Sequence, residues 1–314
     1  MKALQQMIQR VAENPSRPWA LATLVHTEGS TYRKPGARLL VDPDGGTLGV
    51  LSAGCLEEEI ARHGRKVIDD GSPLLLSFDT KRLYGCDGRL KIFVERLPAA
   101  GQNGNLITNI GRLLRNREVC RVRISFEGDS IGSDLLTFDV LATECRGVFI
   151  DTVPLPVRLL LFGTGPEIEP IIELAGNLGW VFERFGHPSE LEGDFRPDAQ
   201  TAAVVATHNF GRDFATLQKL LSLNLRYAGL IGPRKRRDQL LNHLLDLGVT
   251  INPGFFSPAG LDLGAEAPEE IALTIVSEIQ RVLAKGSGQS LRERKTSIHT
   301  PQSVDSSKCP TSAR

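Results

Sequence analysis

Two cysteines in this chain lie in glycine-containing turns, an unusual setting for a cysteine whose only role is packing. Cys55 follows Gly54 in SAGCLEEE, and Cys86 follows Gly85 in GCDG. SAGCLEEE resembles a turn that leads into a helix, where the helix dipole makes a thiol more acidic than usual. Such a thiolate can act as a nucleophile or as a soft ligand for a metal or metal cofactor. The alternative is that each cysteine is simply a small residue in a tight turn.

The other three cysteines carry less chemical information. Cys120 alternates with charged and polar residues in CRVRISF, a period of two that predicts a core position on a half-buried strand. Cys145 is interpreted as a packing residue, and Cys309 lies in a polar tail. An odd number of cysteines without a CxxC pair argues against a disulfide scaffold or a zinc knuckle. A nucleophilic pair with His26 or His63 as the base stays open.

A glycine turn in the second half of the chain is the candidate nucleotide site. Gly163 and Gly165 follow the apolar strand VRLLLF and precede a helix, as in a phosphate-binding turn. The third glycine of the dinucleotide fingerprint is missing, and Pro166 removes a backbone donor at the turn. Glu183 lies 20 residues beyond Gly163, but its strand is predicted to end at Gly186, which cannot bind a ribose hydroxyl. A tight strand–helix connection without a dinucleotide is therefore favoured.

Three further segments follow predicted strands and contain polar side chains. His208 and Asn209 lie in ATHNFGRD, where Asn209 is expected to be a helix N-cap and His208 either a ligand or a hydrogen-bonded loop residue. Arg234 opens a basic run in GLIGPRKRR, at a helix start where positive charge opposes the helix dipole unless an anion is bound. The glycine-rich segment 257–270 is long for a connection inside an α/β domain, which is typical of functional loops.

The elements that position these residues form two groups. Up to about residue 150, short strands predominate and include a hairpin whose turn is DPDGG. From residue 157 onward, strands and helices alternate at the spacing of a doubly wound parallel sheet. The sequence thus predicts an α/β protein with a mixed α/β N-terminal domain at 1–150, a Rossmann-like parallel-sheet domain at 151–286 and a loosely packed polar tail at 287–314.

Composition narrows the class of protein. The chain has 314 residues, 37 basic and 37 acidic side chains, and therefore no general charge that attracts nucleic acid or an acidic membrane. No apolar run approaches the roughly 20 residues of a membrane span. The N-terminal segment MKALQQMIQRVAENP predicts an amphipathic helix that is too polar for a signal peptide. We expect a cytoplasmic protein without a membrane span and without a nucleic-acid partner.

Several stretches resemble the XdhC/CoxI family. TLVHTEGSTYRKPGARLLV, SAGCLE and GCDGRLKIFVERL are similar to the N-terminal domain of that family, and FGTG, ATHNFGRD, YAGLIGPR and AGLDLGAEAPEEIA are similar to its Rossmann-like domain. The similarity covers most of residues 19–285 in the order of the family. Three departures stand out: Ala53 and Asp87 replace glycines beside the two cysteines, and Pro166 replaces a histidine after the Gly-x-Gly.

The resemblance implies an accessory protein of xanthine dehydrogenase-type molybdenum hydroxylases that has no turnover of its own. Such a chaperone would bind molybdenum cofactor, as molybdopterin or its dinucleotide form, receive its terminal sulfur from a cysteine desulfurase, and deliver it to the apo-enzyme; a homodimer is expected. Carried over residue by residue, Cys55 and Cys86 become cofactor and metal ligands beside Gly54 and Gly85, and His208 becomes a cofactor-binding residue. Gly163, Gly165 and Arg234 are added as cofactor-binding candidates. An NAD(P)-dependent oxidoreductase and a nucleotide-sensing regulatory protein are the alternatives.

Overall fold

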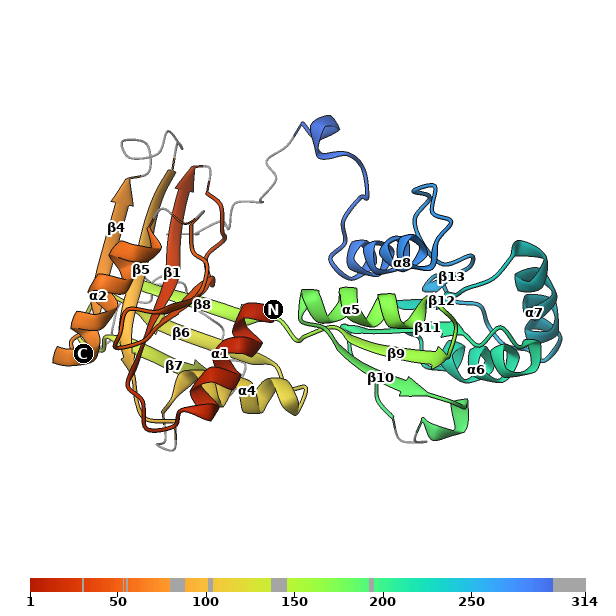
Figure 1. Ribbon diagram of the computed structural model, residues 1–314, viewed down its shortest axis with the longest axis horizontal. Coiled ribbons are helices and arrows are strands. Elements are labelled where there is room, and N and C mark those ends of the chain that lie inside the picture. The colour runs from red at the N-terminus through yellow and green to blue at the C-terminus, as the bar shows by residue number, and fades with distance from the viewer. Residues whose placement is uncertain are drawn as a thin grey trace, which may run out of the picture. The chain divides into compact units, whose positions relative to one another are not determined.

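The chain folds into two compact units, whose main segments are Ala3–Leu155 and Pro156–Thr296 (Figure 1). The computed structural model describes residues 1–29, 31–52, 54, 56–79, 88–100, 104–136, 146–191 and 195–295. Asp151–Val153, which the sequence analysis placed in the second domain, pair with a strand of the first unit. The chain leaves that unit only after Leu155, between the two prolines of DTVPLP.

A five-stranded antiparallel sheet forms the centre of the N-terminal unit. Its strands follow the order β3-β2-β1-β5-β4, and the DPDGG turn joins β2 to β3, with Asp42 Oδ1 accepting hydrogen bonds from the amides of Asp44 and Gly46. The helix α2 covers one face with Ile60, Val67 and Ile68. The elements are β1 (Trp19–Gly29), β2 (Arg38–Val41), β3 (Thr47–Gly49), α2 (Glu57–Asp70), β4 (Leu74–Asp79) and β5 (Gly88–Leu97).

A three-stranded sheet, with the order β7-β6-β8, is tied to the opposite face by buried polar contacts. Arg38 of β2 forms an ion pair with Asp151 of β8 at 2.8 Å, with side chains only 6% and 14% exposed. Glu95 of β5 accepts hydrogen bonds from the amide and the hydroxyl of Ser133. Cys120 is fully buried, as its alternating strand predicted. The remaining elements are α1 (Lys2–Glu13), α4 (Leu106–Arg115), β6 (Cys120–Ser125), β7 (Gly132–Leu136) and β8 (Val148–Val153).

The C-terminal unit is a doubly wound parallel sheet, which confirms the predicted fold class. The strand order is β10-β9-β11-β12-β13, and neighbouring strands pair in parallel throughout. α5 and α8 pack on one face around Leu159, Leu161 and Val204, while α6 and α7 pack on the other. The short strand β13 was not predicted. The elements are β9 (Arg158–Gly163), α5 (Ile168–Leu178), β10 (Val181–Phe185), η1 (Pro188–Glu190), β11 (Thr201–Ala206), α6 (Phe210–Ser222), β12 (Tyr227–Leu230), α7 (Arg234–Asp246), β13 (Phe255–Phe256), α8 (Pro268–Leu283) and η2 (Leu291–Glu293).

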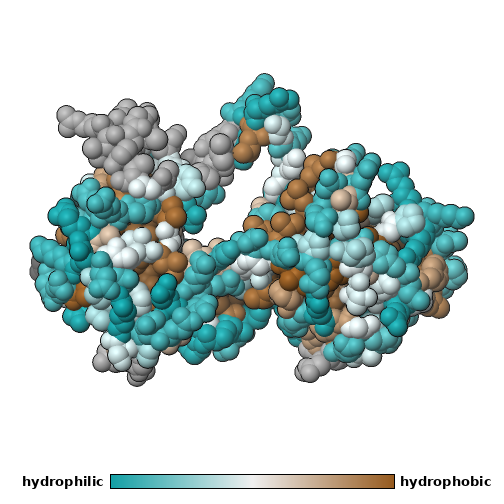
Figure 2. All heavy atoms as spheres, in the orientation of Figure 1, coloured by the Kyte–Doolittle hydropathy of each residue, from teal (hydrophilic) through white to brown (hydrophobic). Residues whose placement is uncertain are grey.

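The surfaces of the two units are mostly hydrophilic, as expected for units whose apolar residues form buried cores. On the face seen in Figure 2, hydrophilic residues cover most of each unit and apolar residues show only in patches between them. Among the described residues, no helix has the length and apolar character needed to cross a membrane.

Candidate functional site

The topology of the five-stranded sheet brings five strand ends to one edge of the N-terminal unit. β1 runs antiparallel to β2 and β5, β2 antiparallel to β3, and β5 antiparallel to β4. The ends of β1, β3 and β4 therefore lie at the same edge as the starts of β2 and β5, as the arrowheads of β1 and β4 show in Figure 1. The segments that carry Cys55 and Cys86 both leave the sheet at this edge, one after β3 and the other between β4 and β5.

Cys55, Cys86 and Gly85 themselves lie outside the described residues, so their roles stay predictions. Gly54 is described: its φ of +101° is a backbone conformation that glycine adopts without strain, and no other described residue lies within 4 Å of the position a Cβ would take. Cys55 follows β3 and Cys86 precedes β5, and these two strands are three strand spacings apart, about 14 Å. Both thiols can reach one ligand only if the two segments extend over the sheet edge toward each other.

Glu57, a residue the sequence analysis did not single out, holds the turn that precedes α2. Its Oε1 accepts hydrogen bonds from the amides of Leu51 and Ser52 at 3.0 and 2.8 Å. Its Oε2 accepts from the Ser52 hydroxyl at 2.5 Å and from the amide of Leu56 at 3.2 Å. One carboxylate thereby fastens both ends of the segment that contains Gly54. The sequence signal is weak, because a glutamate in the first turn of a helix normally needs no tertiary partner.

These contacts also affect the charge on Glu57. Burial by itself raises the pKa of the carboxyl, but the hydrogen bonds from the Ser52 hydroxyl and from the amides of Ser52 and Leu51 outweigh it and lower the pKa. The helix begins at Glu57 with Leu56 as its N-cap, so Cys55 precedes the cap rather than occupying it. The first turn also carries Glu58 and Glu59. Three carboxylates there oppose the effect of the helix dipole on a nearby thiol.

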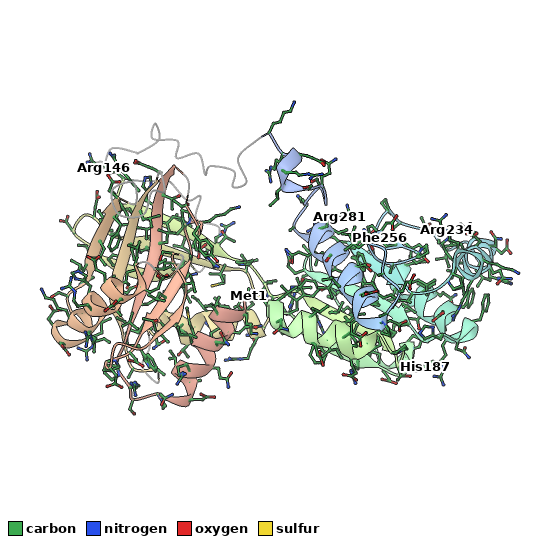
Figure 3. All side chains as sticks on the ribbon, turned by 45° about the horizontal axis from the view of Figure 1, so that its top comes forward. Met1, Arg146, His187, Arg234, Phe256 and Arg281 are labelled. Atoms are coloured by element: carbon green, nitrogen blue, oxygen red, sulfur yellow. The ribbon has the colours of Figure 1, made fainter. Side chains whose placement is uncertain are left out.

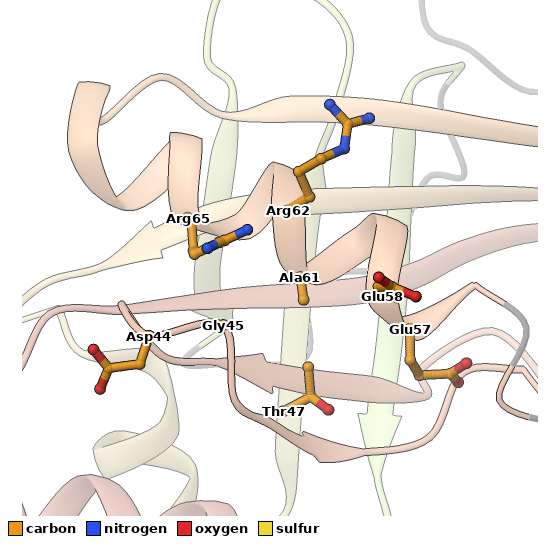
Figure 4. A pocket seen from close by; sticks show the side chains of 8 residues that line it. All are labelled: Asp44, Gly45, Thr47, Glu57, Glu58, Ala61, Arg62 and Arg65. Carbon is orange, nitrogen blue, oxygen red and sulfur yellow. The ribbon is translucent and has the colours of Figure 1, made fainter.

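A shallow pocket lies beside this turn, between α2 and the β2–β3 hairpin. Figure 4 shows Glu58, Arg62 and Arg65 of α2 on one side and Asp44 of the hairpin on the other. The Glu57 carboxylate points away from the arginines (Figure 4). The pocket wall carries both signs of charge, with the carboxylates of Asp44, Glu57 and Glu58 and the guanidinium groups of Arg62 and Arg65, and we assign it no ligand.

In the C-terminal unit, the two predicted glycines lie where β9 and β11 end side by side. Gly163 has a φ of +118°, and a Cβ there would lie 2.2 Å from the carbonyl oxygen of Ala206. The close approach of the two strand ends thus requires a glycine at position 163, whether or not a phosphate binds. At Gly165 a Cβ would lie 2.5 Å from His208 Nε2 and 2.6 Å from Glu167 Oε2. Gly165 and His208, predicted separately, therefore lie together.

The structure weakens the dinucleotide interpretation of this turn. Glu183, the acidic residue that the sequence offered for a ribose contact, is held by Arg158 through two hydrogen bonds of 2.6 and 3.0 Å. Pro166 offers no amide hydrogen at the start of α5, and the buried carboxylate of Glu167 lies beside it. A negative charge in that position repels the pyrophosphate that the helix N-terminus would otherwise attract.

Asn209 is the N-cap of α6, as expected, with its side chain accepting from the amide of Arg212. A buried polar group that sequence reasoning missed lies just behind it. Asp213 is fully buried, accepts a hydrogen bond from the Thr207 hydroxyl at 2.5 Å and forms an ion pair with Arg236. Burial raises the pKa of the Asp213 carboxyl, opposed by Thr207 and Arg236. This pair ties the start of α6 to the start of α7.

The basic run at α7 divides into paired and unpaired side chains. Arg236 and Arg237 are engaged, the latter with Asp238 and with the carbonyl of Ser257. Arg234, labelled in Figure 3 at the start of α7, is exposed and forms no ion pair with the residues that the structure describes. The N-cap Pro233 has no side-chain cap, and the first turn of α7 contains no acidic residue. This helix start therefore fits an anion, whereas that of α5 does not.

Within the described ranges, no three histidine, cysteine, aspartate or glutamate side chains are close enough to hold a metal ion. Cys120, the one described cysteine, is a packing residue: burial raises the pKa of its thiol to about 11. Any metal contact by this chain's own thiols thus depends on cysteines outside those ranges.

Comparison with known proteins agrees with this architecture. The sequence matches the XdhC and CoxI family over residues 12–79 and the XdhC Rossmann domain over residues 159–279, together more than half of the chain. A probable xanthine dehydrogenase subunit of Bacillus subtilis (strain 168) is 29% identical over 310 residues, covering 82% of this chain and 91% of that protein. The molybdenum cofactor insertion chaperone PaoD of Escherichia coli (strain K12) is 24% identical over 287 residues, covering 83% and 82%.

The fold is also found in a solved structure. A crystal structure described as a xanthine dehydrogenase from Bacillus halodurans superimposes with a TM-score of 0.76, covering 91% of this chain and 96% of that one. At 22% identity, this likeness establishes the fold alone. The two matched domains, in the order in which the two units occur here, confirm the resemblance seen in the sequence. The chain belongs to the XdhC and CoxI family and carries an XdhC Rossmann domain.

Proposed function

We propose that this protein is a chaperone that binds molybdenum cofactor and delivers it to a xanthine dehydrogenase-type molybdenum hydroxylase. The observation that carries the proposal is the sheet edge of the N-terminal unit, where the segments of Cys55 and Cys86 both leave the sheet. The relative named as a molybdenum cofactor insertion chaperone supports it. Thiolates suit this cargo, because molybdenum bound to a pterin dithiolene is soft.

The proposal assigns each candidate residue a role. Cys55 and Cys86, next to Gly54 and Gly85, are the metal ligands, with glycine leaving the backbone free to approach the cargo. In the C-terminal unit, Arg234 and the uncapped start of α7 would hold a phosphate of the cofactor. Gly163 and Gly165 shape the turn after β9, and His208 contacts the cargo from the loop after β11.

The partners follow from the same proposal. The apo-hydroxylase receives the cofactor, and a cysteine desulfurase supplies its terminal sulfur while the chaperone holds it. The chaperone acts in the cytoplasm, as a homodimer, and turns over no substrate itself. Glu167 is buried, and Glu183 is already paired with Arg158. Neither carboxylate therefore supports the two alternative functions, a nicotinamide-dependent enzyme or a nucleotide sensor.

The test is the chromophore that accompanies the protein. The chain is produced in a molybdenum-replete host, and its ultraviolet–visible spectrum and molybdenum content are measured after purification. A bound molybdopterin chromophore with about stoichiometric molybdenum is expected. Stoichiometric nicotinamide without molybdenum would instead identify an oxidoreductase and contradict the proposal.

A further inference from the structure

Glu167 and His208 form an acid–base pair at the point where the strand order of the parallel sheet reverses. The loop after β9 carries Glu167 and the loop after the neighbouring β11 carries His208, with helices leaving to opposite faces. Ligands of doubly wound folds bind at this position, outside the carboxyl ends of the strands. His208 Nε2 and Glu167 Oε2 are 3.5 Å apart.

The Glu167 side chain is only 8% exposed, yet its Oε2 accepts no hydrogen bond from the residues that the structure describes. A buried carboxylate oxygen without a donor is unfavourable, and such groups usually belong to functional sites. The polar group that faces it is the imidazole of His208. Gly165 lies against both side chains, and any Cβ there would push them apart.

His208 is held in an uncommon backbone conformation. Its φ is +52°, in the left-handed region that non-glycine residues seldom adopt, and strain of this kind is concentrated at functional sites. The conformation turns the ring toward Glu167 while leaving the side chain 45% exposed. Among the described residues, none forms a hydrogen bond with Nδ1, the other ring nitrogen. The ring thus faces the carboxylate with Nε2, at 3.5 Å and without a hydrogen bond, and leaves Nδ1 open.

The tautomer of the ring decides which kind of ligand atom the open nitrogen accepts. An ionised carboxylate is an acceptor only, so its charge favours a proton on Nε2, the ring nitrogen 3.5 Å away. In the neutral imidazole Nδ1 then has a free lone pair, which accepts a hydrogen bond from a ligand N–H. The charge of Glu167 also disfavours phosphate at this point.

We propose that the Glu167–His208 pair binds the N–H edge of a nitrogen heterocycle, with His208 Nδ1 as the acceptor and Glu167 as the positioning residue. The 2-amino-4-oxopyrimidine ring has this edge and occurs in pterins and in guanine. The inference rests on the proposed function in one respect: the proposed function identifies a pterin, rather than guanine, as the molecule that supplies this ring in the cell.

The first test measures the tautomer directly. Long-range ¹H–¹⁵N spectra of the ¹⁵N-labelled full chain, assigned with His208→Gln, report which ring nitrogen of His208 carries the proton. The wild type is expected to show protonated Nε2 and bare Nδ1. In Glu167→Gln the amide can donate to Nε2, so this preference should be lost. The control Glu169→Gln alters an exposed carboxylate on the same helix and should preserve it. Protonated Nδ1 in the wild type would overturn the proposal, even if Glu167→Gln failed to fold.

The second test measures binding of free heterocycles, by fluorescence for the pterins and by calorimetry for guanosine. Pterin should bind, and 3-methylpterin, which lacks the N3 hydrogen, should bind about tenfold more weakly, as expected for one lost hydrogen bond. Glu167→Gln should weaken pterin by a similar factor, and Glu169→Gln by less than about twofold. A preference for guanosine over pterin would identify a nucleotide as the source. Equal binding of pterin to wild type and Glu167→Gln would refute the role of the pair.

The molybdenum content of the wild type, measured separately, distinguishes the two possible failures. If the wild type retains molybdenum cofactor but the tautomer and pterin results fail, only the role of Glu167 and His208 is wrong. If no molybdenum is retained while pterin binding depends on Glu167, the pair stands and the proposed cargo is wrong.

Discussion

Replacing Glu57 by alanine should destabilise the N-terminal unit, because this one side chain accepts four hydrogen bonds from the turn before α2. In this variant the amides of Leu51 and Ser52 lose the Glu57 carboxylate as their hydrogen-bond acceptor. The amide of Leu56 still donates to the Ser52 hydroxyl at 3.1 Å. With about 1 kcal/mol for each net hydrogen bond, and somewhat more for a charged acceptor, we expect a loss of about 2–3 kcal/mol. Glu57→Gln retains one oxygen and should lose about half as much.

The pH dependence has a defined sign. The pKa of Glu57 is lowered in the folded state, so its contribution is fully present above the pKa of the unfolded chain, about 4.3, and is lost as the pH falls through the folded value. The difference between wild type and Glu57→Ala should therefore shrink below about pH 4. At pH 7 it should be largest.

Urea unfolding followed by tryptophan fluorescence measures this loss. The chain has two tryptophans, Trp19 in β1 and Trp180 beside β10, so a Trp180→Phe background reports on the N-terminal unit alone. Glu58→Ala, on the same turn but exposed, is the matched control and should change stability by less than about 0.5 kcal/mol. Equal losses in the Glu57 and Glu58 variants would refute the assignment of Glu57 as the residue that holds the turn.

Three further results are expected. Calorimetry with NAD and NADP should detect weak binding or none, because Arg158 holds Glu183 and Glu167 lies at the start of α5; a Kd of about 1 µM, near −8 kcal/mol, contradicts this. Arg234→Glu should weaken pyrophosphate binding by about 1–3 kcal/mol, whereas the control Arg292→Glu, at a side chain 86% exposed in η2, should not weaken it. Equal pyrophosphate affinities of wild type and Arg234→Glu would show that the basic run is only a solvated face. Cys120 should resist iodoacetamide at pH 8, since its thiol has a pKa of about 11, and Cys120→Ser should lose about 1–3 kcal/mol; rapid native alkylation would show that it is not buried.

The elements with long apolar runs were predictable because their patterns are local. β1 is buried over residues 19–25 and β9 over residues 159–162, and α8 begins at Pro268 as its sequence indicated. β13 was missed because two residues, Phe255 and Phe256, are too short a run to display a period. β7 and β8 have only short apolar runs of two and three residues, and their pairing with β6 depends on tertiary contacts such as Arg38 with Asp151.

The site was predictable only in part, because sequence patterns reveal residue types and not partners. The glycine turn after β9 and His208 were identified separately, but their contact requires the parallel register of β9 and β11. The same kind of register places Glu183 diagonally opposite Arg158. Glu57 and Glu167 look like ordinary acidic residues at helix starts, and only the fold shows that one holds a turn and the other is buried against an imidazole.

The central claim is that Cys55 and Cys86 hold molybdenum cofactor, and the cofactor content of serine variants tests it most directly. Molybdenum and pterin are quantified in wild type, Cys55→Ser and Cys86→Ser, with Cys309→Ser in the tail as the control. Loss of most cofactor is expected in the first two variants but not in the control, with melting temperatures within about 3 °C of wild type, less than 1 kcal/mol. Full cofactor content in both Cys55→Ser and Cys86→Ser would contradict the claim.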